Sequence, residues 1–223
     1  MNKIRISCAV FTYDQGKFKV LLSKPEIEVG TNWRILSGRL ENDQNVDKAA
    51  LRLLNEFGVT KNLFLQQLKT FVKPNVENTK EIVVVSYYAL INMENYKLNS
   101  ENLDHNRRWC SISEVPYLIN NDNVIIDLSF YQLAHFICNS AIGFDLLPQK
   151  FTLEDVLNLY KEISGNQADG FGFCKKLVQK RILKPVVKKE NIISSSNERL
   201  YTFNALAYDR LLRKEYVFNF HKF

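Results

Sequence analysis

Apolar residues in the first half of the chain recur in short runs that are typical of β-strands. The first two runs are joined by Asp14-Gln-Gly-Lys17, which supplies the turn residues of a hairpin. The fifth run is so nearly continuous in its hydrophobicity that we expect it in the interior of a sheet. The pattern predicts strands at Arg5–Tyr13, Phe18–Ser23, Asn32–Leu36, Leu65–Val72, Glu81–Ile91 and Arg107–Ile112.

Two segments of the same half carry helical patterns. Apolar residues of Val46–Phe57 follow the i, i+3, i+4, i+7 spacing of an amphipathic helix, which we expect to begin at Asn45 or Gln44 and to end at Gly58. A longer stretch, Val124–Ile142, is apolar on several faces and predicts a second helix.

The pattern changes at Gly143-Phe-Asp-Leu-Leu-Pro148, where glycine and proline bracket a break. We therefore expect two domains, residues 1–143 and residues 144–223. After the break, Thr152 and Asp155 have the spacing of a capping box at the start of a helix.

The rest of the second domain has the element order of a winged helix. A second helix is predicted from about Asp169 to Lys180, and strands at Ile182–Val187 and Leu200–Phe203. The segment between the two strands is long, polar and basic at both ends, as a wing would be.

Charge divides the chain at the same place. Residues 1–147 carry 16 basic and 16 acidic residues, whereas residues 148–223 carry 14 basic and 8 acidic ones, which accounts for the whole net charge of +6. A neutral first part joined to a basic second part indicates that the second part meets a polyanion. A chance imbalance of solvated surface charge is the alternative.

Other features limit the classes of protein to consider. No apolar run approaches the ~20 residues that span a bilayer, and the first apolar run reads as a strand instead of a signal peptide. The four cysteines lie far apart without a CxxC pair, which disfavours a disulfide framework or a zinc site. We expect a cytoplasmic protein.

The segment 38–59 resembles the Nudix box, the metal-binding motif of pyrophosphate hydrolases. The matching positions are Gly38, Arg52 fourteen residues later, and Glu56. Three positions that carry glutamate in that motif are instead Gln44, Leu53 and Phe57.

These replacements bear directly on the chemistry. Magnesium needs several hard oxygen ligands in near-octahedral geometry, and one remaining carboxylate cannot hold it tightly. We therefore expect no catalytic residues and no metal-binding residues in this domain. Arg52 and Glu56 are four residues apart on a helix, so we expect an ion pair between them.

Taken along its length, the chain resembles the Nudix-related transcriptional regulators of bacteria. The resemblance is carried by four stretches, Trp33–Leu40, Val84–Ile91, Gly143–Thr152 and Leu200–Asn204. It implies an α+β fold, an α/β/α Nudix sandwich with a mixed sheet, followed by a small winged helix-turn-helix domain. It also implies a small-molecule effector such as a sugar, a sugar phosphate or an ADP-ribose-like compound, double-stranded operator DNA as a partner, and a homodimer.

Candidate contact residues follow from this resemblance and from residue chemistry. For the effector they are Trp33, Arg34, Arg39 and Glu56, although Trp33 could equally be a core residue and the arginines surface residues. For DNA they are Phe173, Lys175, Lys176, Lys180, Arg181, Lys188, Lys189 and Arg199. The family often opens its recognition helix with an Asn-Phe-Arg-type run, but this sequence reads Gly-Phe-Cys-Lys at 172–175.

Two other functions remain open from the sequence. The chain could be a magnesium-dependent Nudix hydrolase of nucleoside diphosphate derivatives, in which case Glu56→Gln would abolish turnover. It could also be a binding protein whose basic domain meets RNA or protein, although it lacks an aromatic and basic stacking face. Only the hydrolase would need a cofactor, which would be Mg²⁺.

Overall fold

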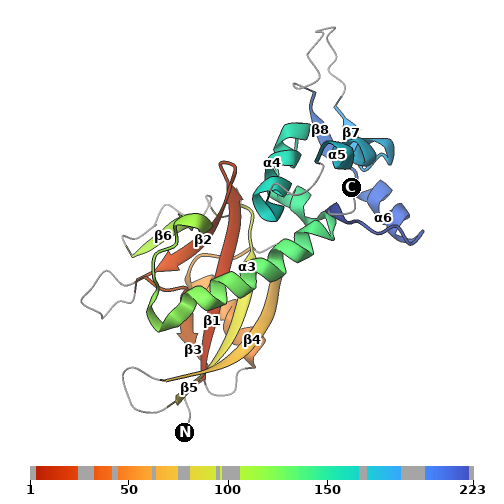
Figure 1. Cartoon of the computed structure of the whole chain (residues 1–223). Coiled ribbons are helices and arrows are strands. Elements are labelled where there is room, and N and C mark those ends of the chain that lie inside the picture. The colour runs from red at the N-terminus through yellow and green to blue at the C-terminus, as the bar shows by residue number, and fades with distance from the viewer. Residues whose placement is uncertain are drawn as a thin grey trace. The chain divides into compact units, whose positions relative to one another are not determined.

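The computed structural model of the chain describes residues 4–24, 33–41, 45–61, 64–74, 81–93, 96, 106–165, 170–186 and 199–220. The chain divides into two compact units (Figure 1). The first unit comprises residues 1–14 and 18–132, and the second comprises residues 15–17 and 133–223. None of the described helices is long and apolar enough to cross a membrane.

A mixed sheet forms the centre of the first unit. Its strands, within the described residues, are β1 (Ile4–Asp14), β2 (Lys17–Ser23), β3 (Leu36–Arg39), β4 (Phe64–Pro74), β5 (Glu81–Leu90) and β6 (Arg107–Ser111). The order is β4-β5-β1-β2-β6, and β3 also pairs with β1. The β1 and β5 pair is parallel, while β4 with β5, β1 with β3, and β2 with β6 are antiparallel. As predicted, the apolar strand β5 lies inside the sheet.

The third predicted strand was misplaced. The segment Asn32–Leu36 was expected to be a strand, but β3 begins at Leu36, and Arg34 makes only an isolated bridge to Ser23. Residue 32 lies outside the described residues. The register places Leu36 opposite Cys8 and Arg39 opposite Arg5, so pairing with the start of β1 decides where this strand forms.

Helices cover both faces of the sheet, which confirms the predicted α/β/α sandwich. On one face α1 (Val46–Glu56) packs its apolar side, with Leu53 and Leu54, into a cluster with Cys8 and Val10 of β1. On the other face lies the start of α3 (Asp122–Cys138), whose Phe130 ring is 5.9 Å from Phe11 and 5.7 Å from Phe18. Short 3₁₀ turns at Ile112–Glu114 and Ile119–Asn121 precede α3.

The ends of α1 follow the sequence signals. The Asn45 side chain accepts a hydrogen bond from the Lys48 backbone N at 2.8 Å, which caps the first turn. Gly58, with φ of +78°, lets the chain leave the helix in a left-handed conformation that a side chain would disfavour. Both predicted helix ends are confirmed.

The second unit contains a winged helix. Its elements are the 3₁₀ turn η3 (Ala141–Leu146), α4 (Leu153–Ser164), α5 (Gly170–Gln179), β7 (Leu183–Pro185), β8 (Tyr201–Phe203) and α6 (Ala205–Leu212). The strands β7 and β8 are antiparallel, and Phe151 forms a bridge to Tyr201 of β8. The predicted capping box is present, since the backbone N of Asp155 donates to Thr152 Oγ1 and the backbone N of Thr152 donates to Asp155 Oδ2.

Aromatic rings fill the core of this unit. The Phe173 ring of α5 lies 4.9 Å from Tyr160 of α4, 5.6 Å from Phe218 and 4.9 Å from Phe220. The segment that follows α6 therefore packs against both helices. Phe173 has no exposed surface, so its side chain belongs to the core, and the prediction that it contacts DNA is wrong.

All four cysteines are buried free thiols. Burial raises the pKa of Cys138 to about 11 and that of Cys174 to about 12. Both side chains therefore stay protonated at neutral pH, which makes them poor nucleophiles.

The burial of Phe173 predicts a large loss of stability in Phe173→Ala. The variant should lower the free energy of unfolding by about 3–5 kcal/mol, because it removes an aromatic ring from a packed core. Denaturant titration followed by circular dichroism measures the change. The matched control is Phe171→Ala on the same helix, which should change stability by less than about 0.5 kcal/mol because that ring is exposed. Equal effects of the two variants would contradict the assignment.

Candidate functional site

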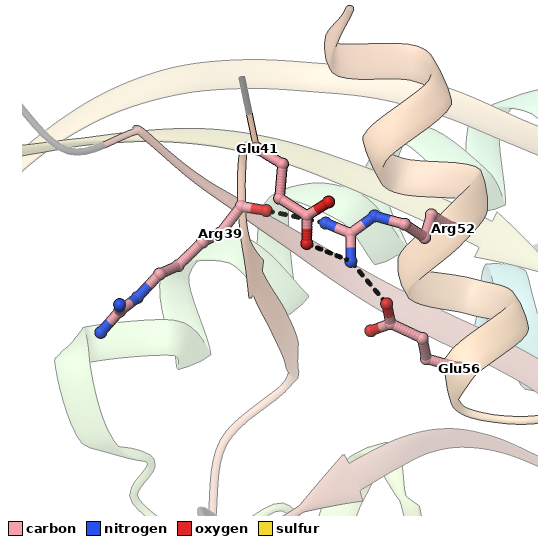
Figure 2. A network of polar contacts seen from close by, with 4 residues as sticks. All are labelled: Arg39, Glu41, Arg52 and Glu56. Atoms are coloured by element: carbon pink, nitrogen blue, oxygen red, sulfur yellow. Dashed lines mark hydrogen bonds and ion pairs between the residues drawn. The ribbon is translucent and has the colours of Figure 1, made fainter. Parts of the chain in front are cut away.

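Four residues of α1 and of the end of β3 form a polar network (Figure 2). Arg52 Nη1 lies 2.5 Å from Glu56 Oε1 and 3.1 Å from Glu41 Oε1. Arg52 Nη2 donates a hydrogen bond to the backbone O of Arg39 at 3.0 Å. The predicted ion pair between Arg52 and Glu56 is confirmed. Glu41 was not predicted, because it lies outside the helical pattern.

The network ties the end of β3 to α1. The carboxylate side chains are well exposed, 60% for Glu41 and 49% for Glu56, so each ion pair contributes at most about 1 kcal/mol. One guanidinium thus partly neutralises both carboxylates. The Arg39 side chain extends away from Arg52, and its guanidinium is exposed (Figure 2).

Of the three positions that lack glutamate, Leu53 and Phe57 lie within the described residues and Gln44 lies outside them. Leu53 is only 2% exposed, and a Cβ added to Gly38 would lie 3.0 Å from Leu53 Cδ1. The glycine therefore leaves room for the close approach of α1 to β3, and the side chain at position 53 points into the core.

Phe57 is covered by a cation. Its ring centroid lies 4.7 Å from the guanidinium carbon of Arg107, and Arg107 Nη1 donates to the Phe57 backbone O at 3.3 Å. Arg107 also interacts with Tyr96, where burial raises the pKa of the phenol and the arginine opposes part of that rise. A fixed positive charge beside position 57 disfavours a second cation there.

These residues do not fit a magnesium ion. Within the described residues, no group of three or more His, Cys, Asp or Glu side chains is placed to hold a metal. Glu41 and Glu56 both form ion pairs with Arg52, and Leu53 and Phe57 offer no oxygen ligand. The described residues of this site therefore do not supply the several hard oxygen ligands that a magnesium ion needs.

Trp33 lies apart from this network, between two basic side chains. Its half-buried ring has Lys24 Nζ at 4.8 Å and the guanidinium carbon of Arg108 at 4.3 Å from its centroid. Such cation–π contacts contribute about 0.5–1 kcal/mol each at exposed sites. The neighbouring Arg34 exchanges two backbone hydrogen bonds with Ser23, at 2.9 and 3.0 Å.

The predicted effector residues therefore fall into two groups. Arg39 and Glu56 both interact with Arg52, the first through its backbone oxygen and the second through its carboxylate. Trp33 and Arg34 instead contact the ends of β2 and β6. The cations beside Trp33 were missed, because Lys24 and Arg108 are brought together only by the pairing of β2 with β6, where Leu22 lies opposite Arg108. No local sequence pattern predicts that contact.

Basic residues of the second unit gather on and after α5. Lys175 and Lys176 are exposed on the helix, and Arg181 is exposed in the turn that follows. Lys180 Nζ lies 4.9 Å from the centroid of the Tyr216 ring. Arg199 is exposed just before β8, while Lys188 and Lys189 lie outside the described residues. Lys184, exposed on β7, adds a basic residue that was not predicted.

Known proteins resemble both parts of the chain. Residues 139–219 match the family described as the AraR C-terminal winged HTH domain. An ADPR-responsive transcriptional repressor, NtrR, from Acinetobacter baylyi is 24% identical over 209 residues, which cover 92% of this chain and 83% of the relative.

Solved structures show the same fold over nearly the whole chain. Shewanella oneidensis NrtR, crystallised with a 27mer DNA, aligns with a TM-score of 0.71 and 18% identity over 96% of this chain and 97% of its own. A MutT/nudix family protein from Enterococcus faecalis aligns with a TM-score of 0.62 and 15% identity over 92% and 88%. The predicted fold class, a Nudix-like domain followed by a winged helix-turn-helix domain, is confirmed.

The carboxylate pairing predicts that magnesium does not stabilise the protein. Millimolar MgCl₂ should shift the melting temperature no more than NaCl of matched ionic strength, because the carboxylates of Glu41 and Glu56 are already paired with Arg52. Differential scanning fluorimetry measures the shift. A saturable rise with MgCl₂ that Glu56→Gln removes, accompanied by turnover of nucleoside diphosphate derivatives, would instead support the hydrolase.

Proposed function

We propose that this chain, which resembles the Nudix-related transcriptional regulators with a C-terminal winged helix-turn-helix domain, is an ADP-ribose-responsive transcriptional repressor. One observation carries the proposal: a Nudix sandwich without a metal ligand set among its described residues precedes a winged helix that contains the chain's surplus of positive charge. The first domain, residues 1–143, would sense the effector. The second, residues 144–223, would bind operator DNA in the cytoplasm as part of a homodimer.

The effector residues that we propose match the chemistry of a phosphorylated sugar or of ADP-ribose. The Arg39 guanidinium is exposed and can bind a phosphate. Trp33 offers an aromatic surface edged by Lys24 and Arg108, and Arg34 lies beside it. The Glu56 carboxylate, held by Arg52, can accept hydrogen bonds from sugar hydroxyls.

On the DNA side, exposed cations suit contacts with phosphate. Lys175 and Lys176 belong to the second helix of the helix-turn-helix, the one that enters the major groove in such domains. Arg181 and Arg199 flank β7 and β8, and Lys180 extends from the end of the same helix. Such contacts supply affinity that falls steeply with salt but do not read sequence.

We expect DNA binding that depends on these lysines. Full-length protein should shift a duplex from the promoter upstream of its own gene, and Lys175→Ala/Lys176→Ala should weaken binding by tenfold or more and reduce the salt slope by about two. Electrophoretic mobility shift over a range of KCl concentrations measures both. The control, Lys48→Ala/Lys61→Ala, removes two exposed charges from the first unit and should bind as wild type. If the wild-type protein shifts no duplex at low salt, the proposal fails.

The effector should weaken the binding of the protein to DNA. ADP-ribose should raise the melting temperature of the free protein by mass action and release it from the duplex. Trp33→Ala should weaken both effects about tenfold or more, whereas Tyr131→Ala, which removes an exposed ring from α3, should retain them. Fluorimetry and titration of the gel shift measure the two effects. If ADP-ribose changes neither, the nucleotide is not the effector.

A further inference from the structure

The helix α5 has two distinct faces. Gly170, Phe173, Cys174 and Leu177 are buried at the i, i+3, i+4, i+7 spacing of a core-facing side. The opposite side carries Phe171, Lys175 and Gln179, which are all exposed. Because these three follow each other at intervals of four residues, they form one stripe along the helix.

Phe171 is an unusual member of that stripe. Its ring is 73% exposed, although burial is the normal state of a phenylalanine. It lies in the first turn of α5, the part of a recognition helix whose side chains reach base edges in helix-turn-helix domains. The same helix carries Lys175 and Lys176, which are both exposed and whose positive charges complement the phosphates of a DNA backbone.

Packing fixes the start of this helix. A Cβ added to Gly170 would collide with Leu157 Cδ2, so α5 begins in direct contact with α4. Three residues after Gly170, Phe173 is locked in the aromatic core. With Gly170 and Phe173 held on the inner side, Phe171 is directed outward by the geometry of the helix.

We propose that Phe171 reads a thymine of the operator by packing its ring against the C5-methyl group in the major groove. An aromatic hydrocarbon has no hydrogen-bond donor or acceptor, so the thymine methyl is the base-edge group that it can recognise. Lys175, one helical turn or about 6 Å further along the same stripe, can reach a neighbouring phosphate. This inference rests on the proposed DNA binding and adds a residue that determines sequence preference.

Deoxyuridine substitution tests the contact, because it removes only the methyl group. A high-affinity duplex is first selected from a random-sequence pool with the full-length wild-type protein, and each thymine is then replaced by deoxyuridine in turn. Wild type should lose about fourfold in affinity at one thymine per half-site, the effect of one methyl group. Phe171→Ala should bind the thymine duplex about tenfold more weakly and should lose that sensitivity.

Controls separate this contact from the rest of DNA binding. Leu206→Ala removes another strongly exposed apolar side chain, from α6, and should keep the wild-type deoxyuridine profile. If wild type selects no sequence and shifts no duplex, the proposed function itself fails. If wild type selects a sequence but Phe171→Ala keeps every deoxyuridine effect, or instead changes only the oligomeric state in sedimentation, the thymine contact is overturned and the repressor remains.

Discussion

The close packing of α1 against β3, where Leu53 lies over Gly38, places the polar network of the first domain. Because a glycine faces the helix, α1 can approach β3 until the leucine side chain fills the space above it. Together with Ala49 and Ala50, Leu53 turns one side of α1 toward the sheet. Leu54 joins the core, while Arg52 and Glu56 remain at the surface.

Position 53 differs from the Nudix motif in the role of its side chain. In the Nudix motif the position of Leu53 carries an acidic residue, and here it carries an apolar one that strengthens packing. Burying a carboxylate at this depth without partners would be costly. At this position the leucine side chain therefore contributes to the core and supplies no metal ligand.

Most of the fold could be predicted from the sequence because its signals are local. The turn of the first hairpin, the caps at Asn45 and Thr152 and the periodicity of α1 act within a few residues, and all appear as expected. Contacts that depend on distant pairing could not be predicted. Pairing with the start of β1 decides the position of β3, and the pairing of β2 with β6 brings an arginine to Trp33. On α5, sequence resemblance pointed to Phe173, but the burial pattern of the helix leaves Phe171 as the exposed ring.

The segment after α6 supports the winged helix through contacts with the buried side and the end of α5. Phe218 and Phe220 rest on Phe173 of α5, and Tyr216 lies beside Lys180 at the end of that helix. The orientation of α5 is thus coupled to residues 216–220. Any partner, protease or modification that displaced this segment would weaken the packing on the buried side of α5. Operator affinity could therefore be adjusted at this segment without altering a base contact.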